Sequence, residues 1–278
     1  MRAGTSSIER CGVARWSFSD VTLSDRPLIL VTILMKFLKH LLVLFLSLLV
    51  ACSPPANVEL GNGNASAEAV ELFDGESLNG WQNFGGGNFY VDDGTIVGEA
   101  APGLPNSFLA TNKMYGDFEL EVEFKVDPLL NSGIQIRSNT YPEETKTMRW
   151  GGKFKEDGSK DIIEKLWEKD RFWGYQIEID PSERAWSGTL YEEGGRGFLH
   201  SPDDAKAPEG TFKQGEWNHF KIIAIGDRFQ VWLNGVQTAD VKDDLTASGY
   251  VALQLHGIGK NKQKIGKKVA WRNITLKQ

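Results

Sequence analysis

The chain is poor in cysteine, with only Cys11 and Cys52 among its 278 residues. Residues 53–278 therefore cannot form a disulfide and contain no thiol nucleophile. They also lack a glycine-rich phosphate loop and the motif of a serine nucleophile elbow. No two of the four histidines have the spacing of paired metal ligands. These absences exclude a disulfide-stapled scaffold, a cysteine hydrolase and a P-loop nucleotide-binding protein.

A long uninterrupted hydrophobic run is also missing. The apolar stretch from Leu28 to Ala51 is broken by Lys36, Lys39 and His40, so it lacks the roughly 20 consecutive apolar residues of a membrane span. From Met35 onward the order is instead a basic segment followed by an apolar segment, which predicts a signal peptide over residues 35–51. We interpret residues 1–34 as an N-terminal extension that results from a start codon assigned too early.

The predicted signal peptide ends in Leu49-Val50-Ala51-Cys52, which is similar to a bacterial lipoprotein box. This pattern predicts cleavage before Cys52 and attachment of lipid to its side chain. A plain signal peptide followed by an incidental cysteine is the alternative. Residues 52–71, rich in Pro, Gly, Asn, Ser and Ala, predict a flexible tether.

The predicted exported part is acidic. Without the six basic and three acidic residues of 1–51, the chain keeps 25 Lys or Arg against 34 Asp or Glu, a net charge of −9. Nucleic-acid binding requires neutralisation of phosphates by basic side chains. The sequence therefore argues against a nucleic-acid partner.

Residues 72–278 contain many short alternating segments separated by turn signals. Phe118–Val126 alternates apolar and charged residues, and Asp93-Gly94 and Asn234-Gly235 are typical hairpin turns. This pattern predicts an all-β, two-sheet antiparallel sandwich. We expect one short helix or loop insertion around residues 141–172, with the helix over Lys160–Asp170 because Ile162, Ile163, Leu166 and Trp167 make an apolar stripe. The insertion could be a flap beside the site or a surface ornament.

Three predicted strands carry unusually polar faces. In Trp173–Asp180, apolar residues alternate with Gln176, Glu178 and Asp180, whose side chains should point to the opposite side from the core. The other two faces consist of Gln135 with Arg137 and of Gln254 with His256. If the three strands are neighbours, these residues form one surface suited to hydrogen bonding with a polyhydroxylated ligand.

Several interpretations of these residues remain open. Glu178 and Asp180, about 6.5–7 Å apart along a strand, suit a general acid–base pair or a structural ion pair with Arg137. His256 suits proton transfer but is equally a structural histidine. The carboxylates together with His256 could hold a divalent ion. Trp173 is one of several tryptophans that could stack on a sugar.

The order of motifs across residues 72–278 resembles the 3-keto-disaccharide hydrolase domain family. The matching segments are Leu72-Phe73-Asp74-Gly75, Leu78-Asn79-Gly80-Trp81, Tyr115–Leu120, Asn131–Arg137, Gly174–Asp180, Gly188-Thr189-Leu190-Tyr191, Gly215-Glu216-Trp217-Asn218, Asn234-Gly235, Leu253–Gly257 and Trp271–Ile274. The resemblance implies a concanavalin A-like jelly roll in an exported bacterial protein that cleaves glycosides already oxidised at C3.

The resemblance also implies roles for the residues of the polar faces. We expect Glu178 or His256 to be the base and Asp180 its partner or the acid. Arg137 and Gln254 are expected to bind the oxyanion and the hydroxyls of the substrate. Gln135, Gln176, Tyr191 and Trp173 complete the expected substrate-binding set.

Two other functions compete with this expectation. A glycosidase of laminarinase type shares the jelly roll and uses acids at alternate strand positions, although the first such position here is Gln176. The second alternative is a non-catalytic, carbohydrate-binding lipoprotein of the cell envelope.

Overall fold

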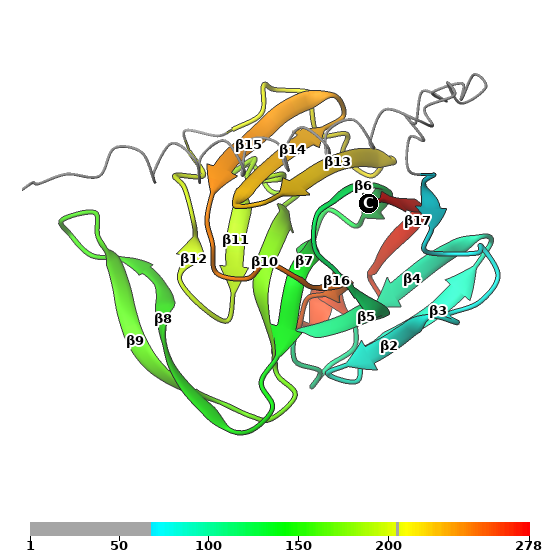
Figure 1. The fold of residues 1–278 in the computed structure, drawn as a ribbon. Helices are drawn as coiled ribbons and strands as arrows, with labels where there is room; N and C mark the ends of the chain where they lie inside the picture. The colour runs from blue at the N-terminus through cyan, green and yellow to red at the C-terminus, as the bar shows by residue number, and fades with distance from the viewer. Residues whose placement is uncertain (1–67, 204–205) are drawn as a thin grey trace, which may run out of the picture. The chain divides into compact units, whose positions relative to one another are not determined.

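The computed structural model describes residues 68–203 and 206–278, which are built almost entirely of β-strands (Figure 1). These residues belong to one unit, Asn64–Gln278. The predicted extension 1–34, the signal peptide 35–51, Cys52 and most of the tether 52–71 lie outside the described residues. In the described part, no helix is long and apolar enough to cross a membrane.

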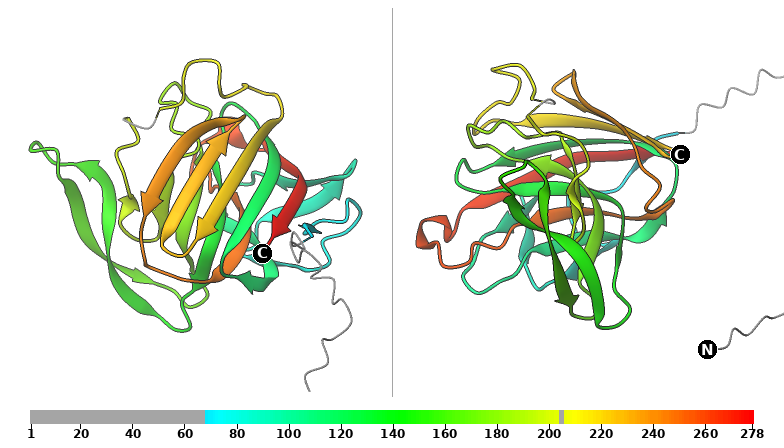
Figure 2. Two further views of the ribbon diagram at one scale, coloured as in Figure 1. Left: turned by 45° about the horizontal axis from the view of Figure 1, so that its top comes forward. Right: turned by 90° about the vertical axis from the view of Figure 1, so that its left-hand side faces the viewer.

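The strands form two large antiparallel sheets, which confirms the predicted sandwich. In the first sheet the strand order is β15-β14-β13-β6-β17-β4-β3, and β1 pairs with β17. Its strands are β1 (Val70–Glu71), β3 (Asn88–Asp92), β4 (Thr95–Glu99), β6 (Phe118–Val126), β13 (Asn218–Ile225), β14 (Arg228–Leu233), β15 (Val236–Lys242) and β17 (Lys268–Lys277). Figure 2 shows β13, β14 and β15 side by side in this layer.

The second sheet carries the predicted polar strands. Its strand order is β12-β11-β10-β7-β16-β5-β2, so the three strands with polar faces are indeed neighbours. Its strands are β2 (Trp81–Phe84), β5 (Ser107–Tyr115), β7 (Ser132–Thr140), β10 (Phe172–Ile179), β11 (Leu190–Glu193), β12 (Gly197–Phe198) and β16 (Gly249–Leu255).

The core lies between the two sheets and follows the alternation of the sequence. On β6, Leu120, Val122 and Phe124 are fully buried, whereas Glu119 and Glu123 face outward and pair with Lys221 and Arg272. The two Asx-Gly turns adopt the expected left-handed conformation, with φ of 44° at Asp93 and 47° at Asn234. These hairpins therefore form where the turn residues predict them.

The predicted helix over Lys160–Asp170 is wrong. This segment is strand β9 (Lys160–Trp167), which pairs with β8 (Thr145–Phe154) in a separate two-stranded hairpin, the β8–β9 arm. A helix needs a surface on which to bury its apolar stripe, but Ile162, Ile163 and Leu166 are 44%, 41% and 45% exposed. Only Trp167 is buried. The β-branched isoleucines favour the extended conformation, and the arm extends beside the sheets (Figure 1).

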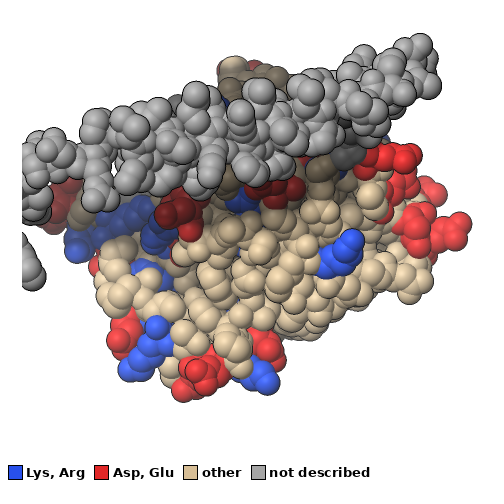
Figure 3. Space-filling model, viewed as in Figure 1, with Lys and Arg blue, Asp and Glu red and all other residues tan. Residues whose placement is uncertain are grey.

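On the face that Figure 3 displays, Asp and Glu gather at the right-hand edge, whereas Lys and Arg lie among acidic residues at the left and along the bottom. The broad centre of this face carries few charges. This distribution contrasts with the continuous basic surface of a nucleic-acid-binding protein.

Candidate functional site

A cleft of about 490 Å³ lies against the second sheet, where β10, β7 and β16 are neighbours. It brings together residues from the sheet, the β8–β9 arm and six of the loops that connect strands. The lining residues are Asn106, Asn131, Arg149, Trp150, Trp167, Arg171, Gln176, Glu178, Arg184, Trp186, Tyr191, Glu193, Gly194, Gly195, Phe198, Gln254, His256 and Lys264. Four of the residues predicted from the strands, Gln176, Glu178, Gln254 and His256, line this cleft together.

Glu178 is the most unusual titratable group of the cleft. Its side chain is only 7% exposed, and burial raises its pKa to about 7. Asn131 Nδ2 donates to Oε1 at 2.6 Å, and Gln176 Nε2 donates to Oε2 at 2.9 Å. These two amide donors stabilise the carboxylate form and only partly offset the desolvation. A carboxyl group poised near neutrality is suited to general acid–base catalysis.

A chain of side-chain amides continues from Glu178 across the sheet. Gln176 Oε1 accepts from Gln135 Nε2 at 2.6 Å and from Gln254 Nε2 at 2.7 Å. Ser138 Oγ donates to Gln135 Oε1 at 2.7 Å. All three glutamines are at most 2% exposed. Gln135 lies opposite Gln176 on the neighbouring strand and donates to it but does not line the cleft, whereas Gln176 and Gln254 do.

His256 is neutral and presents one free ring nitrogen. Burial lowers its pKa below the usual value. Its Nδ1 lies 2.8 Å from the carbonyl oxygen of Gly257. Because a carbonyl can only accept, Nδ1 carries the hydrogen of the neutral ring, and Nε2 keeps its lone pair. The tautomer is assigned from this contact, and it makes His256 a second candidate base.

Tyr191 provides a hydroxyl that stays protonated. Its pKa is raised, first by burial and then by the nearby carboxylates of Glu193 and Glu178. Tyr191 lies on β11 opposite Gln176 of β10, which places it in the cleft. A phenol of this kind can donate a hydrogen bond to a substrate oxygen on which negative charge develops.

The strand pattern did not single out Glu193, Arg171, Asn106 or Asn131. Glu193 is 6% exposed, forms an ion pair with Arg171, and accepts from Asn106 Nδ2 at 3.4 Å. Glu193 lies two residues after Tyr191 on β11, so it shares the face of Tyr191. That alternation was the signal available in the sequence. Asn106 and Arg171 lie in loops, where no periodicity identifies them.

Arg137 does not share a polar face with Gln135, so that prediction is wrong. The registers of β7 with β10 and with β16 both shift next to Arg137, and its φ is 43°. This β-bulge turns the side chain away from the cleft. The guanidinium, 1% exposed, donates instead to the carbonyls of Gly116 and Gly226 and to Asp117 Oδ1 at 2.7–2.8 Å.

Asp180 and Trp173 also lie away from the cleft. Asp180 follows the last residue of β10 and lines a different cavity. Its Oδ2 pairs at 2.9 Å with Nη2 of Arg184, which itself lines the cleft. The charge of Asp180 still contributes to the raised pKa of Glu178. The ring of Trp173 stacks on Tyr141 with a centroid distance of 5.6 Å. Neither residue belongs to the lining of the cleft, so the second carboxylate there is Glu193.

Aromatic side chains form one wall of the cleft. The arm contributes Trp150, whose backbone nitrogen donates to Gly195 O at 2.9 Å. The ring of Trp150 lies 5.8 Å from Phe198 and 6.4 Å from Tyr191. The arm therefore borders the site, as a flap would, although it is a hairpin and not a helix. Aromatic walls beside polar groups are suited to sugar rings.

No group of three or more His, Cys, Asp or Glu side chains in residues 68–203 and 206–278 is arranged to hold a metal ion. Glu178 and His256 line the same cleft, but the amide contacts of Glu178 already occupy both of its oxygens. The divalent ion suggested by the sequence therefore finds no ligand cluster among these residues.

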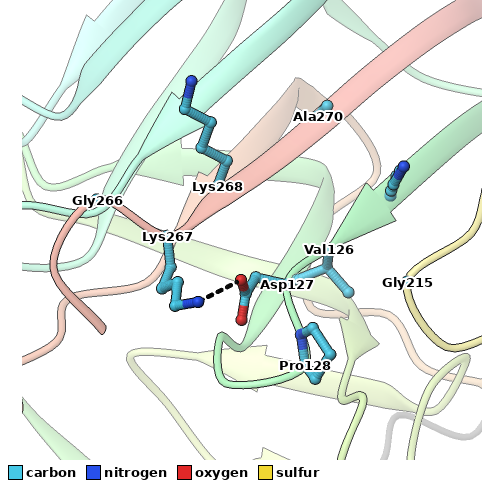
Figure 4. A pocket seen from close by; sticks show the side chains of 9 residues that line it. Val126, Asp127, Pro128, Gly215, Gly266, Lys267, Lys268 and Ala270 are labelled. Atoms are coloured by element: carbon cyan, nitrogen blue, oxygen red, sulfur yellow. Dashed lines mark ion pairs between the residues drawn. The ribbon is translucent and has the colours of Figure 1, made fainter. Parts of the chain in front are cut away.

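A second cavity, of about 470 Å³, differs in its chemistry. It lies at the ends of β6 and β17 and is lined by Lys125, Asp127, Lys267 and Lys268 among others. Figure 4 shows the ion pair between Lys267 Nζ and Asp127 Oδ2, at 3.1 Å. Lys268 in turn lies near Glu99. One ion pair, Lys267 with Asp127, joins two of the residues that line this cavity, and no buried acid or histidine lines it.

The fold and the cleft together define an antiparallel jelly-roll sandwich whose second sheet carries a polar, carboxylate-containing cleft with an aromatic wall. The chain belongs to the 3-keto-alpha-glucoside-1,2-lyase-like domain family, whose model matches residues 68–277. This match confirms the family that the sequence motifs resemble. Membership supports a carbohydrate-related function, either hydrolytic or binding. No curated protein matches the chain.

Solved structures resemble this chain at low identity. A carbohydrate-binding module, CBM66 from Bacillus subtilis, has a TM-score of 0.47 at 15% identity, over 72% of this chain and 96% of its own. A candidate glycosyl hydrolase from Parabacteroides distasonis has a TM-score of 0.45 at 18% identity, over 75% and 93%. The exoplasmic/lumenal domain of VIP36 has a TM-score of 0.45 at 15% identity, over 73% and 86%. These scores are too low to support a functional argument.

Proposed function

We propose that this domain cleaves the glycosidic bond of 3-keto-glycosides, with Glu178 as the base. The observation that carries the proposal is the buried carboxyl of Glu178, whose pKa is raised to about 7 and whose two oxygens are held by amide donors in a sugar-sized cleft. A ketone at C3 acidifies the hydrogen on C2, so a base of this strength can remove it.

The reaction then balances without an external oxidant. The carboxylate of Glu178 takes the C2 proton, and the electron pair of the C–H bond forms an enolate on the C3 oxygen. The enolate collapses to the ketone, C1–O breaks, and the leaving oxygen takes the proton from Glu178 to become an alcohol, which returns Glu178 to its carboxylate form. Water adds across the new C1–C2 double bond, which completes a net hydrolysis.

The other groups of the cleft suit supporting roles. Tyr191, which stays protonated, is placed to donate to an oxygen that gains charge. Arg149 and Lys264 add positive charge to the lining, which favours the enolate electrostatically, whereas the charge of Arg171 is compensated by Glu193. His256 offers a lone pair at Nε2 and is the alternative base. The protein thus needs no covalent intermediate for this chemistry.

A substrate panel tests the reaction class. The chain from Ser53 onward should release sugar from a 3-keto-disaccharide and leave the unoxidised disaccharide and a β-glucan intact. Cleavage of the glucan or of the parent disaccharide, without cleavage of the keto sugar, would favour a direct glycosidase. Sugar binding without turnover of any substrate would favour a carbohydrate-binding protein.

The pH dependence of kcat/KM distinguishes the two candidate bases. A base must be deprotonated to act, so with Glu178 as the base the rate should rise with pH and level off above about 7. Burial lowers the pKa of His256 below its usual value, so with His256 as the base the rise should lie below pH 6.5. A rate that falls as the pH increases through 7 would contradict Glu178 as the base.

We also propose that the chain is exported and anchored at the bacterial cell envelope by lipid on Cys52. The signal-peptide pattern that ends in Leu49-Val50-Ala51-Cys52 supports this. Globomycin treatment should produce a slower-migrating precursor, and Cys52→Ala should abolish labelling with palmitate. Palmitate labelling that survives Cys52→Ala would contradict the anchor.

A further inference from the structure

The chain of amides that begins at Glu178 has a free end in the cleft. Among the described residues, Gln254 Oε1 is a buried oxygen with no hydrogen-bond partner, although Gln254 is 0% exposed and lines the cleft. A buried acceptor without a donor costs about 1–3 kcal/mol. Because Gln254 lines the cleft, a hydroxyl group that binds against its side chain can supply the missing donor.

The direction of the amide chain determines which atom Gln254 leaves free. The ionised carboxylate of Glu178 can only accept, so Gln176 must turn its NH₂ group toward Glu178 and its Oε1 toward Gln254. Gln254 must then donate its own NH₂ to Gln176, as the 2.7 Å contact shows. Reversing the amide of Gln254 would bring two carbonyl oxygens together. Gln254 therefore offers the cleft an acceptor.

The hydrogen bonds of Gln176 to Glu178 and Gln254 are possible because the residue between them, Gly133, has no side chain. Gly133 lies on β7 between Glu178 of β10 and Gln254 of β16, directly opposite both. A Cβ at Gly133 would lie 2.5 Å from Gln176 Cδ and 2.8 Å from Gln176 Nε2. The space over Gly133 is therefore occupied by the Gln176 amide, which reaches Glu178 on one side and Gln254 on the other.

We propose that Gln254 Oε1 accepts a hydrogen bond from a hydroxyl group of the sugar, with Gln176 as the positioning residue that sets its orientation. This inference rests on the proposed function and adds a specificity element to it. An acceptor pairs with a hydroxyl and not with the C3 ketone or its enolate. Of the two roles expected from the sequence, ligand of the oxyanion and ligand of a hydroxyl, the free Oε1 of Gln254 suits only the second.

The test is a thermodynamic cycle that combines removal of the Gln254 amide from the protein with removal of each hydroxyl group from the sugar. Dissociation constants for methyl α-glucoside and its four monodeoxy analogues are measured with the full chain and with Gln254→Met. The kcat/KM is measured with the 3-keto forms of the parent and of the 2-, 4- and 6-deoxy analogues, since the 3-deoxy sugar has no oxygen at C3 to oxidise. One deoxy analogue should bind about tenfold to a hundredfold more weakly than the parent to the wild type. Gln254→Met should bind that analogue and the parent equally, while its losses on the other analogues stay unchanged.

Gly133→Ala tests the positioning role of Gln176. The backbone of Gly133 lies outside the left-handed region, and the atoms that a methyl group would meet belong to the flexible Gln176 side chain, so the fold should persist. The variant should lose the same hydroxyl discrimination as Gln254→Met. Gly116→Ala is the matched control, because its Cβ would meet only Ala247 O at 3.6 Å, and it should keep full discrimination.

The outcomes separate this inference from the proposed reaction. If each deoxy substitution weakened binding by the same factor in the wild type and in Gln254→Met, while the keto sugar was still turned over, only the role of Gln254 would be overturned. If Gln254→Met abolished the discrimination against one deoxy analogue, but no keto sugar was turned over, Gln254 would be supported as the hydroxyl ligand and the proposed reaction would be overturned. A chain that binds none of these sugars would overturn both.

Discussion

Glu178→Gln should lower kcat/KM on a 3-keto-glycoside by about 10²–10⁴-fold, the usual contribution of a positioned base. The substitution keeps the volume of the side chain and one carbonyl oxygen that can accept from Asn131 or Gln176. It removes the ability to take a proton, and it places an NH₂ group against one of the two amide donors, so Asn131 or Gln176 must turn its amide. Substrate binding should therefore change much less than turnover, which single-turnover kinetics and a binding isotherm measure separately.

Asp180→Asn is the informative control for this experiment. Asp180 lies at the end of the same strand, but it lines a different cavity and pairs with Arg184. The variant should keep turnover within several-fold of the wild type, provided that circular dichroism shows it to be folded. If Asp180→Asn lost turnover and Glu178→Gln kept it, Glu178 would not be the base, and Asp180 would have the catalytic role expected from the sequence.

Arg137→Met should reduce the free energy of unfolding by about 2–4 kcal/mol, because it leaves carbonyl acceptors without their donor. The guanidinium, 1% exposed, supplies donors to the carbonyls of Gly116, Ala224 and Gly226. Its cation also lies over the ring of Phe229, 5.2 Å from the centroid. Urea unfolding monitored by tryptophan fluorescence measures the loss.

Arg228→Met is the matched control, since its ion pair with Asp240 is solvent-exposed. Exposed ion pairs contribute little to stability, so this variant should unfold close to the wild type. The KM of folded Arg137→Met should also be unchanged. A raised KM with unchanged stability would instead make Arg137 a substrate ligand, which would contradict its position outside the cleft.

The central part of the site follows from simple alternation. Period-two patterning of β10 places Gln176 and Glu178 on the face opposite Tyr175 and Ile177. In the structure, both side chains line the cleft on that face. The same reasoning places Gln254 on β16. These predictions succeed because a strand with one apolar face in a sandwich core has only one possible register.

The same alternation fails where the backbone departs from regular geometry. The sequence of Ile134–Ser138 does not predict the β-bulge that turns Arg137 out of the cleft. A left-handed φ at an arginine is set by tertiary contacts and not by the residue itself. Asp180 fails for a related reason, since β10 ends at Ile179 and alternation has no meaning beyond a strand.

Loop residues of the site could not be predicted from periodicity. Asn131 holds Glu178, and Arg171 holds Glu193, yet both lie just outside strands. Gly133 is a sequence signal of another kind, because a glycine inside a strand often marks the close approach of another group, here the amide of Gln176. The β8–β9 arm was missed because exposed Ile and Leu residues mimic the stripe of an amphipathic helix.

The most direct test of the account follows the hydrogen at C2 of the substrate. The chain is given a 3-keto-glycoside that carries deuterium at C2 in ordinary water, and the released keto sugar is analysed by mass spectrometry, with Glu178→Gln and buffer alone as controls. Proton abstraction predicts a primary isotope effect on kcat/KM and loss of the label at the rate of turnover. Turnover with the label retained and no isotope effect would contradict C2 proton abstraction.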